Sequence, residues 1–251
     1  MYFDSHAHLD DPRFDADREE IFAALAQQGP VMNVGCDLAS SEASIALAHR
    51  YSFVYAAVGS HPDDAAHVDD RRLEIYRSLC ADERVRAIGE IGLDYHYEDV
   101  PRAQQIRAFE QQLALAEALH LPVIIHEREA HGDAMEILRR HPEVQGVFHC
   151  FSGSKEMALW LVERGWYIGF TGVLTFKNAR RAVETAQALP LDRILIETDC
   201  PYMAPEPYRG RRNDSRYVPL VAAKLAELRG LTQQEAGRIT EENAKRLFRI
   251  Q

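Results

Sequence analysis

The sequence predicts an α/β fold, a (β/α)8 TIM barrel with extra helices at its C-terminal end. Eight short apolar runs are spread along the 251 residues, and segments with helical spacing lie between them. Side chains that suit metal ions stand at or near the downstream ends of several runs. Strands and helices in alternation predict a parallel sheet covered by helices. Because the length fits one barrel and no linker is visible, we expect residues 1–251 to form a single domain.

The apolar runs define the expected strands, and their number is that of a (β/α)8 barrel. The first run has the sequence YFDSHAH and the last has the sequence RILIETD. The eight expected strands cover residues 2–8, 30–36, 53–61, 85–93, 121–127, 146–151, 166–172 and 193–199.

Helices are expected between these runs. Apolar residues recur every three or four positions in residues 15–29, 102–120 and 154–165, which is the period of an amphipathic helix. A glycine closes the first and the third of these segments, as is common at helix ends.

The chain continues past the last expected strand. A loop rich in proline and glycine at 200–214 precedes two helical segments, 218–230 and 232–248. Thr232 followed three residues later by Glu235 is the pattern of a capping box, so the last helix is expected to begin there.

A doubly wound sheet would also be read as repeated strand and helix. That fold usually carries a glycine-rich phosphate loop after its first strand. This chain has His-Ala-His at that place, and we therefore favour the barrel.

Composition limits the class of protein. No stretch approaches the roughly 18 uninterrupted apolar residues of a membrane span, and the start has no basic apolar signal region. We therefore expect a cytoplasmic protein with no membrane association and no obligate protein partner. The four cysteines are widely spaced, which predicts neither a disulfide framework nor a cysteine zinc site. They are Cys36, Cys80, Cys150 and Cys200.

The formal net charge of −10 disfavours a long, non-specific grip on nucleic acid, because that affinity comes mostly from lysine and arginine at phosphates. A phosphate substrate is still allowed, since bound dications would add positive charge that a count of side chains omits. The charge limits the size of the contact more than the type of substrate.

Six side chains of metal-ligand type stand at strand ends. His6 and His8 are two residues apart on one strand, so both can point to the same face and bind one ion. Strand ends on one rim of a parallel barrel converge on a single pocket. Imidazole and carboxylate groups are ligands of borderline and hard divalent cations. The six expected ligands are His6, His8, Glu90, His126, His149 and Asp199.

Six ligands are more than one tetrahedral ion needs, and they suit two dications roughly 3.5–4 Å apart. Glu90 is the expected bridge, because a carboxylate offers two oxygens. His6, His8 and Asp199 would complete the coordination of one ion. His126 and His149 would coordinate the other. A water bound to the ions would have a lowered pKa and act as nucleophile, with Asp199 orienting it or taking its proton. The ligands tolerate Mg²⁺, Mn²⁺, Zn²⁺ or Ni²⁺.

Other polar residues are weaker candidates. His61 and Glu197 are expected close to the reaction, and Asp94 is a candidate to orient a ligand imidazole. Arg128 is a candidate phosphate ligand. Two arginines of the RGRR segment are further candidates, Arg209 and Arg211. Cys150 follows His149 directly, so we expect its side chain to face the helices.

The chain resembles the TatD family of metal-dependent deoxyribonucleases, within the amidohydrolase-like proteins. The resemblance runs nearly from end to end, through DSHAHLD, VGSHP, GEIGLDY, LPVIIHEREA, FHCFSG, ETDCPY, APEPYRGRRN and ENAKRLF. It implies a barrel with two divalent ions that hydrolyses phosphodiester bonds of DNA, often from the 3′ end of single strands. It also implies the six ligands named above, with His61 and Glu197 near the reaction.

Two departures from the family pattern stand out. Glu127 occupies a position that is commonly a small serine, and Asp214 and Ser215 occupy a loop that commonly holds a proline. Extra acid at the entrance is expected to weaken binding to DNA, while every ligand is kept.

The leading hypothesis is a two-metal 3′ to 5′ exodeoxyribonuclease acting on single strands or 3′ ends. A second hypothesis keeps the metal site but cleaves an amide or another ester, such as aminoacyl-tRNA. The fourth strand carries no lysine of the kind that bridges the ions of many amidohydrolases. This absence disfavours the amidohydrolase hypothesis. A third hypothesis is a non-catalytic protein with a structural metal site. Structural sites close their coordination with protein groups, which a rim open to solvent disfavours.

Overall fold

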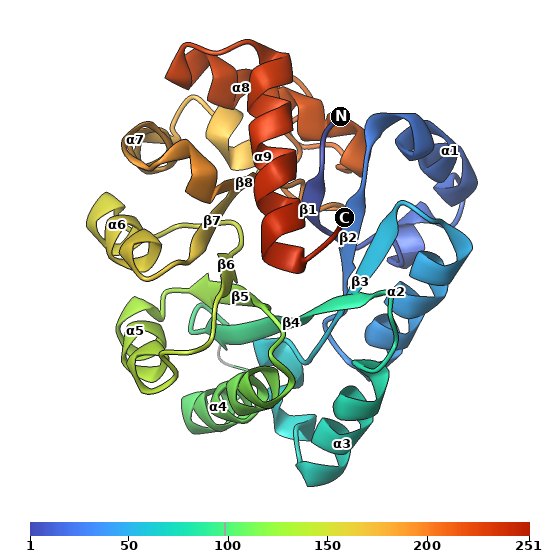
Figure 1. The fold of residues 1–251 in the computed structure, drawn as a ribbon, viewed down its shortest axis with the longest axis vertical. Helices are drawn as coiled ribbons and strands as arrows, with labels where there is room; N and C mark the ends of the chain where they lie inside the picture. The colour runs from blue at the N-terminus through green and yellow to red at the C-terminus, as the bar shows by residue number, and fades with distance from the viewer. Residues whose placement is uncertain (98) are drawn as a thin grey trace.

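Eight parallel strands form one sheet in the computed structural model, which describes residues 1–97 and 99–251. The strands follow one another in chain order, and each pairs in parallel with the next (Figure 1). A bridge between Ala7 and Cys200 brings the two edges together. The strands are β1 (Asp4–Ala7), β2 (Val31–Val34), β3 (Val54–Val58), β4 (Val85–Asp94), β5 (Val123–Arg128), β6 (Gly146–Phe148), β7 (Tyr167–Phe170) and β8 (Ile194–Ile196).

Helices surround the sheet and connect its strands (Figure 1). The α-helices are α1 (Arg18–Gln28), α2 (Leu38–Arg50), α3 (Asp70–Leu79), α4 (Arg102–Leu119), α5 (His131–Arg140), α6 (Lys155–Glu163), α7 (Arg180–Ala188), α8 (Val218–Arg229) and α9 (Gln233–Phe248). Short 3₁₀ helices lie at Pro12–Phe14, Pro62–His67, Gly172–Thr175, Leu191–Arg193 and Ser215–Tyr217. The predicted (β/α)8 barrel with additional C-terminal helices is confirmed.

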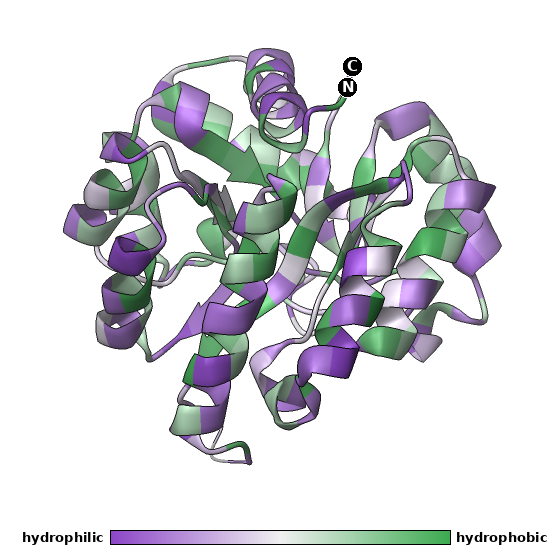
Figure 2. Ribbon diagram, turned by 60° about the horizontal axis from the view of Figure 1, so that its bottom comes forward, coloured by the Kyte–Doolittle hydropathy of each residue, from purple (hydrophilic) through white to green (hydrophobic). Residues whose placement is uncertain are grey.

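The barrel has two apolar layers. One layer fills the space between the sheet and the helices, and the other fills the barrel interior with side chains such as Ile124, Val147 and Leu195. Figure 2 shows the apolar residues along the strands and on one side of many helices, with hydrophilic residues on the outer faces. Parallel strands buried on both faces need such continuous apolar sequences.

Alternation along the strands extends the interior layer into the functional end. Ile124 lies two residues before His126, and Val147 lies two residues before His149, so each pair points to the same side of the sheet. The apolar member of each pair fills the barrel, and the polar member stands above it at the carboxyl end of the strand.

Helix α9 covers the opposite, amino-terminal end of the barrel. Its last residues, Leu247 and Phe248, belong to the interior layer, and the Phe248 ring lies 6.0 Å from the ring of Phe3. The predicted capping box is present, with Thr232 and Glu235 bonded reciprocally. The side chains of metal-ligand type lie at the other end of the barrel, at the carboxyl ends of the strands.

Within the described residues, no helix is both long enough and apolar enough to cross a lipid bilayer.

Candidate metal centre

Strand β1 provides the two histidines of the HxH pair. His6 lies within the strand and is fully buried, whereas His8 follows its last residue. Their Nε2 atoms lie 3.1 Å apart, so both rings are directed to the same point. The other ring nitrogen of His8, Nδ1, lies 2.8 Å from the carbonyl oxygen of Val34.

Glu90 on β4 lies at the middle of the cluster and is only 3% exposed. Its Oε2 is 3.3 Å from Nε2 of His6 and 3.6 Å from Nε2 of His8. Its Oε1 is 2.8 Å from Nδ1 of His126 and 2.7 Å from Nε2 of His149. The two oxygens of one carboxylate therefore face two different pairs of imidazoles.

His126 and His149 come from neighbouring strands. His126 lies on β5 and His149 directly follows β6, and His126 Nδ1 is 3.2 Å from His149 Nε2. The second nitrogen of His126, Nε2, is 3.0 Å from Oδ2 of Asp94. Asp94 thus contacts a candidate ligand imidazole at its outer nitrogen, at the place expected for an orienting carboxylate.

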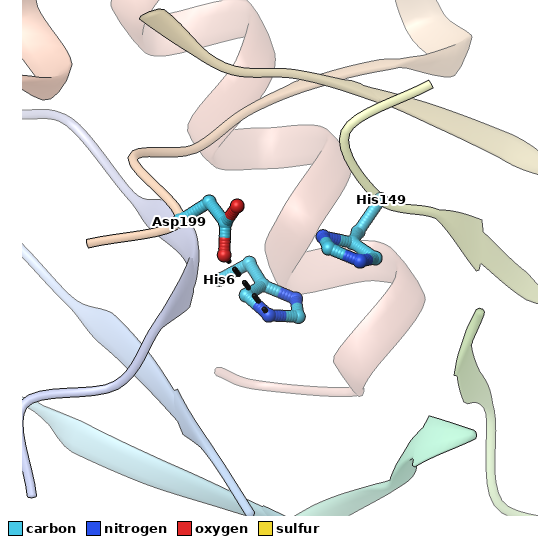
Figure 3. A group of neighbouring side chains, drawn as sticks. All are labelled: His6, His149 and Asp199. Atoms are coloured by element: carbon cyan, nitrogen blue, oxygen red, sulfur yellow. Dashed lines mark ion pairs between the residues drawn. The ribbon is translucent and has the colours of Figure 1, made fainter. Parts of the chain in front are cut away.

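Asp199 reaches the cluster from the loop after β8. Its backbone has φ +54°, in the left-handed region, and the turn directs its carboxylate back over β1. Its Oδ1 lies 3.6 Å from Nε2 of His8 and 3.9 Å from Nε2 of His6. Figure 3 shows the carboxylate pointing at His6, and the His6 and His149 rings stack with their centroids 4.0 Å apart.

The electrostatics of the cluster favour positive charge. Burial raises the pKa of Glu90, but the neighbouring His149 and His6 outweigh it and hold that pKa well below its usual value. Burial raises the pKa of Asp199 too, but the hydrogen bond with His8 and the charges of the neighbouring histidines together lower it. Burial lowers the pKa of His126, yet hydrogen bonds to Asp94 and Glu90 raise it to about 10. Ionised carboxylates of this kind hold positive charge beside them, as protons on imidazoles or as metal ions.

All six residues expected as metal ligands lie in this cluster. Three overlapping groups each have ligand atoms within 4.8 Å of one another, and any of them could hold an ion. The groups are His6, His149 and Asp199; His6, His8 and Glu90; and His61, Glu90 and His126.

Comparison with known proteins fits this arrangement. The family model described as TatD related DNase matches residues 3–249, nearly the whole chain. The chain belongs to the TatD family. The resemblance noted in the sequence is thereby confirmed.

Relatives in the TatD family cover the full length of the chain. An uncharacterized metal-dependent hydrolase, YabD of Bacillus subtilis, is 43% identical over 100% of both chains. The 3′-5′ ssDNA/RNA exonuclease TatD of Cronobacter sakazakii is 36% identical, covering 98% of this chain and 97% of its own. The crystal structure of YJJV, a TatD homologue of Escherichia coli, superimposes with a TM-score of 0.92 at 33% identity, over 100% of this chain and 98% of the other. The chain is a metal-dependent hydrolase of the TatD family.

The two further catalytic candidates, His61 and Glu197, lie beside different members of the metal-ligand cluster. Nε2 of His61 is 3.8 Å from Oε1 of Glu90. Glu197 is fully buried behind His149, with its Oε1 3.9 Å from Nδ1 of that ring. Glu197 accepts hydrogen bonds from the Ser5 hydroxyl at 3.1 Å and from the backbone N–H of Cys150 at 2.5 Å, and burial raises its pKa to about 7.

The three arginines expected to bind substrate are not equivalent. Arg128 is the last residue of β5 and lines a cavity beside the centre. Arg209 lies over the ring of Phe176, 4.2 Å from its centroid, in the loop after β8. Arg211 is exposed on the same loop. Neither of these two lines the cavity among the described residues, and their role in binding substrate stays a prediction.

The acidic residues at both departures from the TatD pattern are nearly buried, and the expected weakening of DNA binding stays a prediction. The Glu127 side chain is 2% exposed, and it accepts hydrogen bonds from the Ala130 backbone and His131 at the start of α5. Asp214 is 2% exposed and pairs with Arg216. Glu127 is among the residues that line the cavity beside the centre, and both carboxylates are hydrogen-bonded to neighbouring residues of the fold.

The sequence did not predict that two cysteines, Cys36 and Cys150, lie near the metal centre. The expectation that Cys150 faces the helices is wrong, because β6 ends at Phe148 and Cys150 has φ +43°, which breaks the alternation; the residue lines the cavity beside the centre. Cys36 lies against the cluster, with Sγ 3.6 Å from both His8 Nδ1 and Glu90 Oε2. Its position at the end of the second apolar run, residues 30–36, was the one available signal.

Proposed function

We propose that the chain is a 3′ to 5′ exodeoxyribonuclease in which a water activated by two divalent ions attacks the phosphodiester bond. One observation carries the proposal: the two oxygens of Glu90 face two separate sets of ligand atoms. His6, His8 and Asp199 lie on the Oε2 side. His126 and His149 lie on the Oε1 side. Such a carboxylate is suited to bridge two ions.

The hydrogen bonds of the His8 and His126 imidazoles indicate whether the site is suited to bind metal ions. His8 Nδ1 is 2.8 Å from a carbonyl oxygen, so it donates its proton there and its Nε2 carries a lone pair in the neutral ring. His126 Nε2 is 3.0 Å from Asp94, so its Nδ1 is likewise left as an acceptor in the neutral ring. That Nδ1 faces a Glu90 oxygen at 2.8 Å. Two acceptors at this distance repel unless a proton or a cation lies beside them, and the donor set therefore fits metal ions.

The bound ions would lower the pKa of a coordinated water and stabilise negative charge on the phosphate. The chain's own residues supply the proton transfer and the orientation. We assign to Asp199 the role of accepting the proton of the attacking water, because its lowered pKa keeps it ionised at neutral pH. We assign to His61 a contact with the phosphate, since its side chain lies 3.8 Å from Glu90 and is more exposed than the carboxylate, at 14% against 4%. Glu197 would hold His149 from behind.

Action at strand ends is supported by charge and by relatives. A formal net charge of −10 is poorly suited to a long contact with nucleic acid, whereas a pocket for one chain end needs few phosphate contacts. TatD of Cronobacter sakazakii is named a 3′-5′ ssDNA/RNA exonuclease, and it is 36% identical to this chain. We assign substrate phosphates to Arg128, with Arg209 and Arg211 as further contacts on the loop after β8.

The test uses purified protein loaded in turn with Mg²⁺, Mn²⁺, Zn²⁺ and Ni²⁺, and single-stranded DNA labelled at its 3′ end. We expect release of labelled mononucleotides that EDTA abolishes. The Asp199→Asn variant should lose about 10²–10⁴-fold in kcat while it keeps its fold by circular dichroism. A protein that releases no mononucleotide with any ion, but cleaves lactones, cyclic amides or aminoacyl-tRNA, would support the amidohydrolase or esterase alternative.

A further inference from the structure

A cavity of about 680 Å³ opens directly beside the metal centre, on the side of strands β5 to β8. His126, His149 and Asp199 form one of its walls. The volume lies in the range of sites for small molecules. Any group placed in this cavity is therefore next to the reacting atoms.

The wall away from the cluster is apolar. It contains Phe151 and Phe170, together with Val173 and Leu174 from the segment after β7. Met203 adds an apolar side chain that is 42% exposed. A phosphate or a metal ion gains nothing from such a wall, which suits a flat, uncharged part of the substrate.

Cationic side chains line the same cavity. Arg128 comes from β5, and Arg180 and Arg181 come from the start of α7. Guanidinium groups bind phosphates through paired hydrogen bonds. A ligand with an apolar flat part and an adjacent negative charge matches this combination, and a nucleotide has both.

We propose that this cavity is a terminal-base pocket, which holds the nucleobase of the 3′-terminal nucleotide against Phe170, Val173, Leu174 and Met203 while the scissile phosphate lies at the metal centre. The proposal rests on the proposed nuclease function and deepens it. The pocket holds one base beside the cluster, so cleavage releases one nucleotide at a time. Base faces are apolar whatever the base, and the pocket therefore tolerates all four.

The experiment varies the substrate and the pocket together. One substrate is a single-stranded oligonucleotide with an ordinary 3′ end, and the other has an abasic tetrahydrofuran residue at that end. We expect the wild type to cleave the ordinary end about tenfold or more faster in kcat/KM, the size of effect that loss of one stacked base gives.

The pocket is then filled by Ala182→Trp, since Ala182 of α7 lines the cavity and is partly buried. This variant should lose most of the discrimination between the two substrates. Ala188→Trp, at an exposed position of the same helix, is the matched control and should keep the wild-type ratio. Val173→Thr, which keeps the shape but adds a hydroxyl to the apolar wall, should give an intermediate ratio and covers the case that the tryptophan variant does not fold.

The outcomes separate the two proposals. Equal cleavage of the ordinary and abasic ends by the wild type, or an unchanged ratio in folded Ala182→Trp and Val173→Thr, would overturn the terminal-base pocket and leave the nuclease function standing. Failure of the wild type to cleave either oligonucleotide would overturn the nuclease function, and the pocket proposal with it.

Discussion

Each imidazole of the cluster has one nitrogen turned to the centre, and the surroundings of its second nitrogen differ from residue to residue. His8 is held by a backbone carbonyl and His126 by Asp94. Nδ1 of His6 and Nδ1 of His149 are buried with no hydrogen-bond partner among the described residues. The orientation of the His6 ring therefore depends on packing and, we infer, on the ion that it binds, whereas Nδ1 of His149 faces Oε1 of Glu197 at 3.9 Å.

The Asp94→Asn substitution tests the role of the group behind a ligand. The amide keeps the size of the side chain but removes the charge that fixes the His126 tautomer, so we expect metal affinity to fall about 10–100-fold. Metal content after dialysis against a graded chelator series measures this loss. Asp133→Asn is the control, because Asp133 bonds to Tyr95 outside the cluster. Equal affinity in both variants would show that Asp94 has no role in metal binding.

Metal binding should release protons at neutral pH. Burial lowers the pKa of His126, but hydrogen bonds to Asp94 and Glu90 together raise it to about 10. Burial also lowers the pKa of His149, but Glu90, Asp199 and Glu197 together raise it above its usual value. With a pKa of about 10, the His126 ring holds a proton in the metal-free protein at pH 7, whereas ligation needs the ring neutral. Affinity should therefore rise as pH rises through neutrality and fall as pH drops. Calorimetric titrations in two buffers of different ionisation enthalpy count the protons, and a count of zero would contradict this account.

At the scale of single elements, strand β7 leaves room for Glu197 because its residue 169 is a glycine. A Cβ at Gly169 would lie 2.5 Å from a carboxylate oxygen of Glu197. Gly169→Ala should therefore push Glu197 away from His149 and lower kcat about tenfold or more, because misplaced groups around a ligand cost activity. Gly132→Ala on α5 is a matched control, since its Cβ would meet nothing within 4 Å. Steady-state kinetics of the two variants should differ, and unaltered activity in Gly169→Ala would remove Glu197 from the proposed mechanism.

Apolar runs and polar residues at their ends were enough to predict the elements and the set of residues that meet at the barrel mouth. The ends of the strands were less predictable. The run at 193–199 contains a strand of only Ile194–Ile196, and the left-handed turn at Asp199 that brings its carboxylate over β1 has no sequence marker such as glycine. A left-handed backbone conformation after the end of β6 is also the reason why the predicted side-chain direction of Cys150 was wrong. Alternation predicts side-chain direction only while the chain stays extended.

The charge of the whole molecule limits how it can hold a polymer. With a formal net charge of −10 and arginines gathered at one cavity, we expect about two or three phosphate contacts. The logarithm of 1/KM for single-stranded DNA should then fall with the logarithm of salt concentration with a slope of about −2. Measuring KM over a series of NaCl concentrations gives the slope. A value steeper than about −5 would indicate a long binding surface in place of a pocket for one end.

The architecture of the whole barrel concentrates its chemistry at one end. Helix α9 covers the amino-terminal opening, the interior is filled with apolar side chains, and residues from position 6 to position 199 meet at the other opening. Crystals of the protein grown with Mn²⁺ or Zn²⁺, with anomalous diffraction recorded at the metal edge, test this account most directly. We predict two anomalous peaks roughly 3.5–4 Å apart, one on each side of the Glu90 carboxylate. A single peak bound on one side only, or metal bound elsewhere, would contradict it.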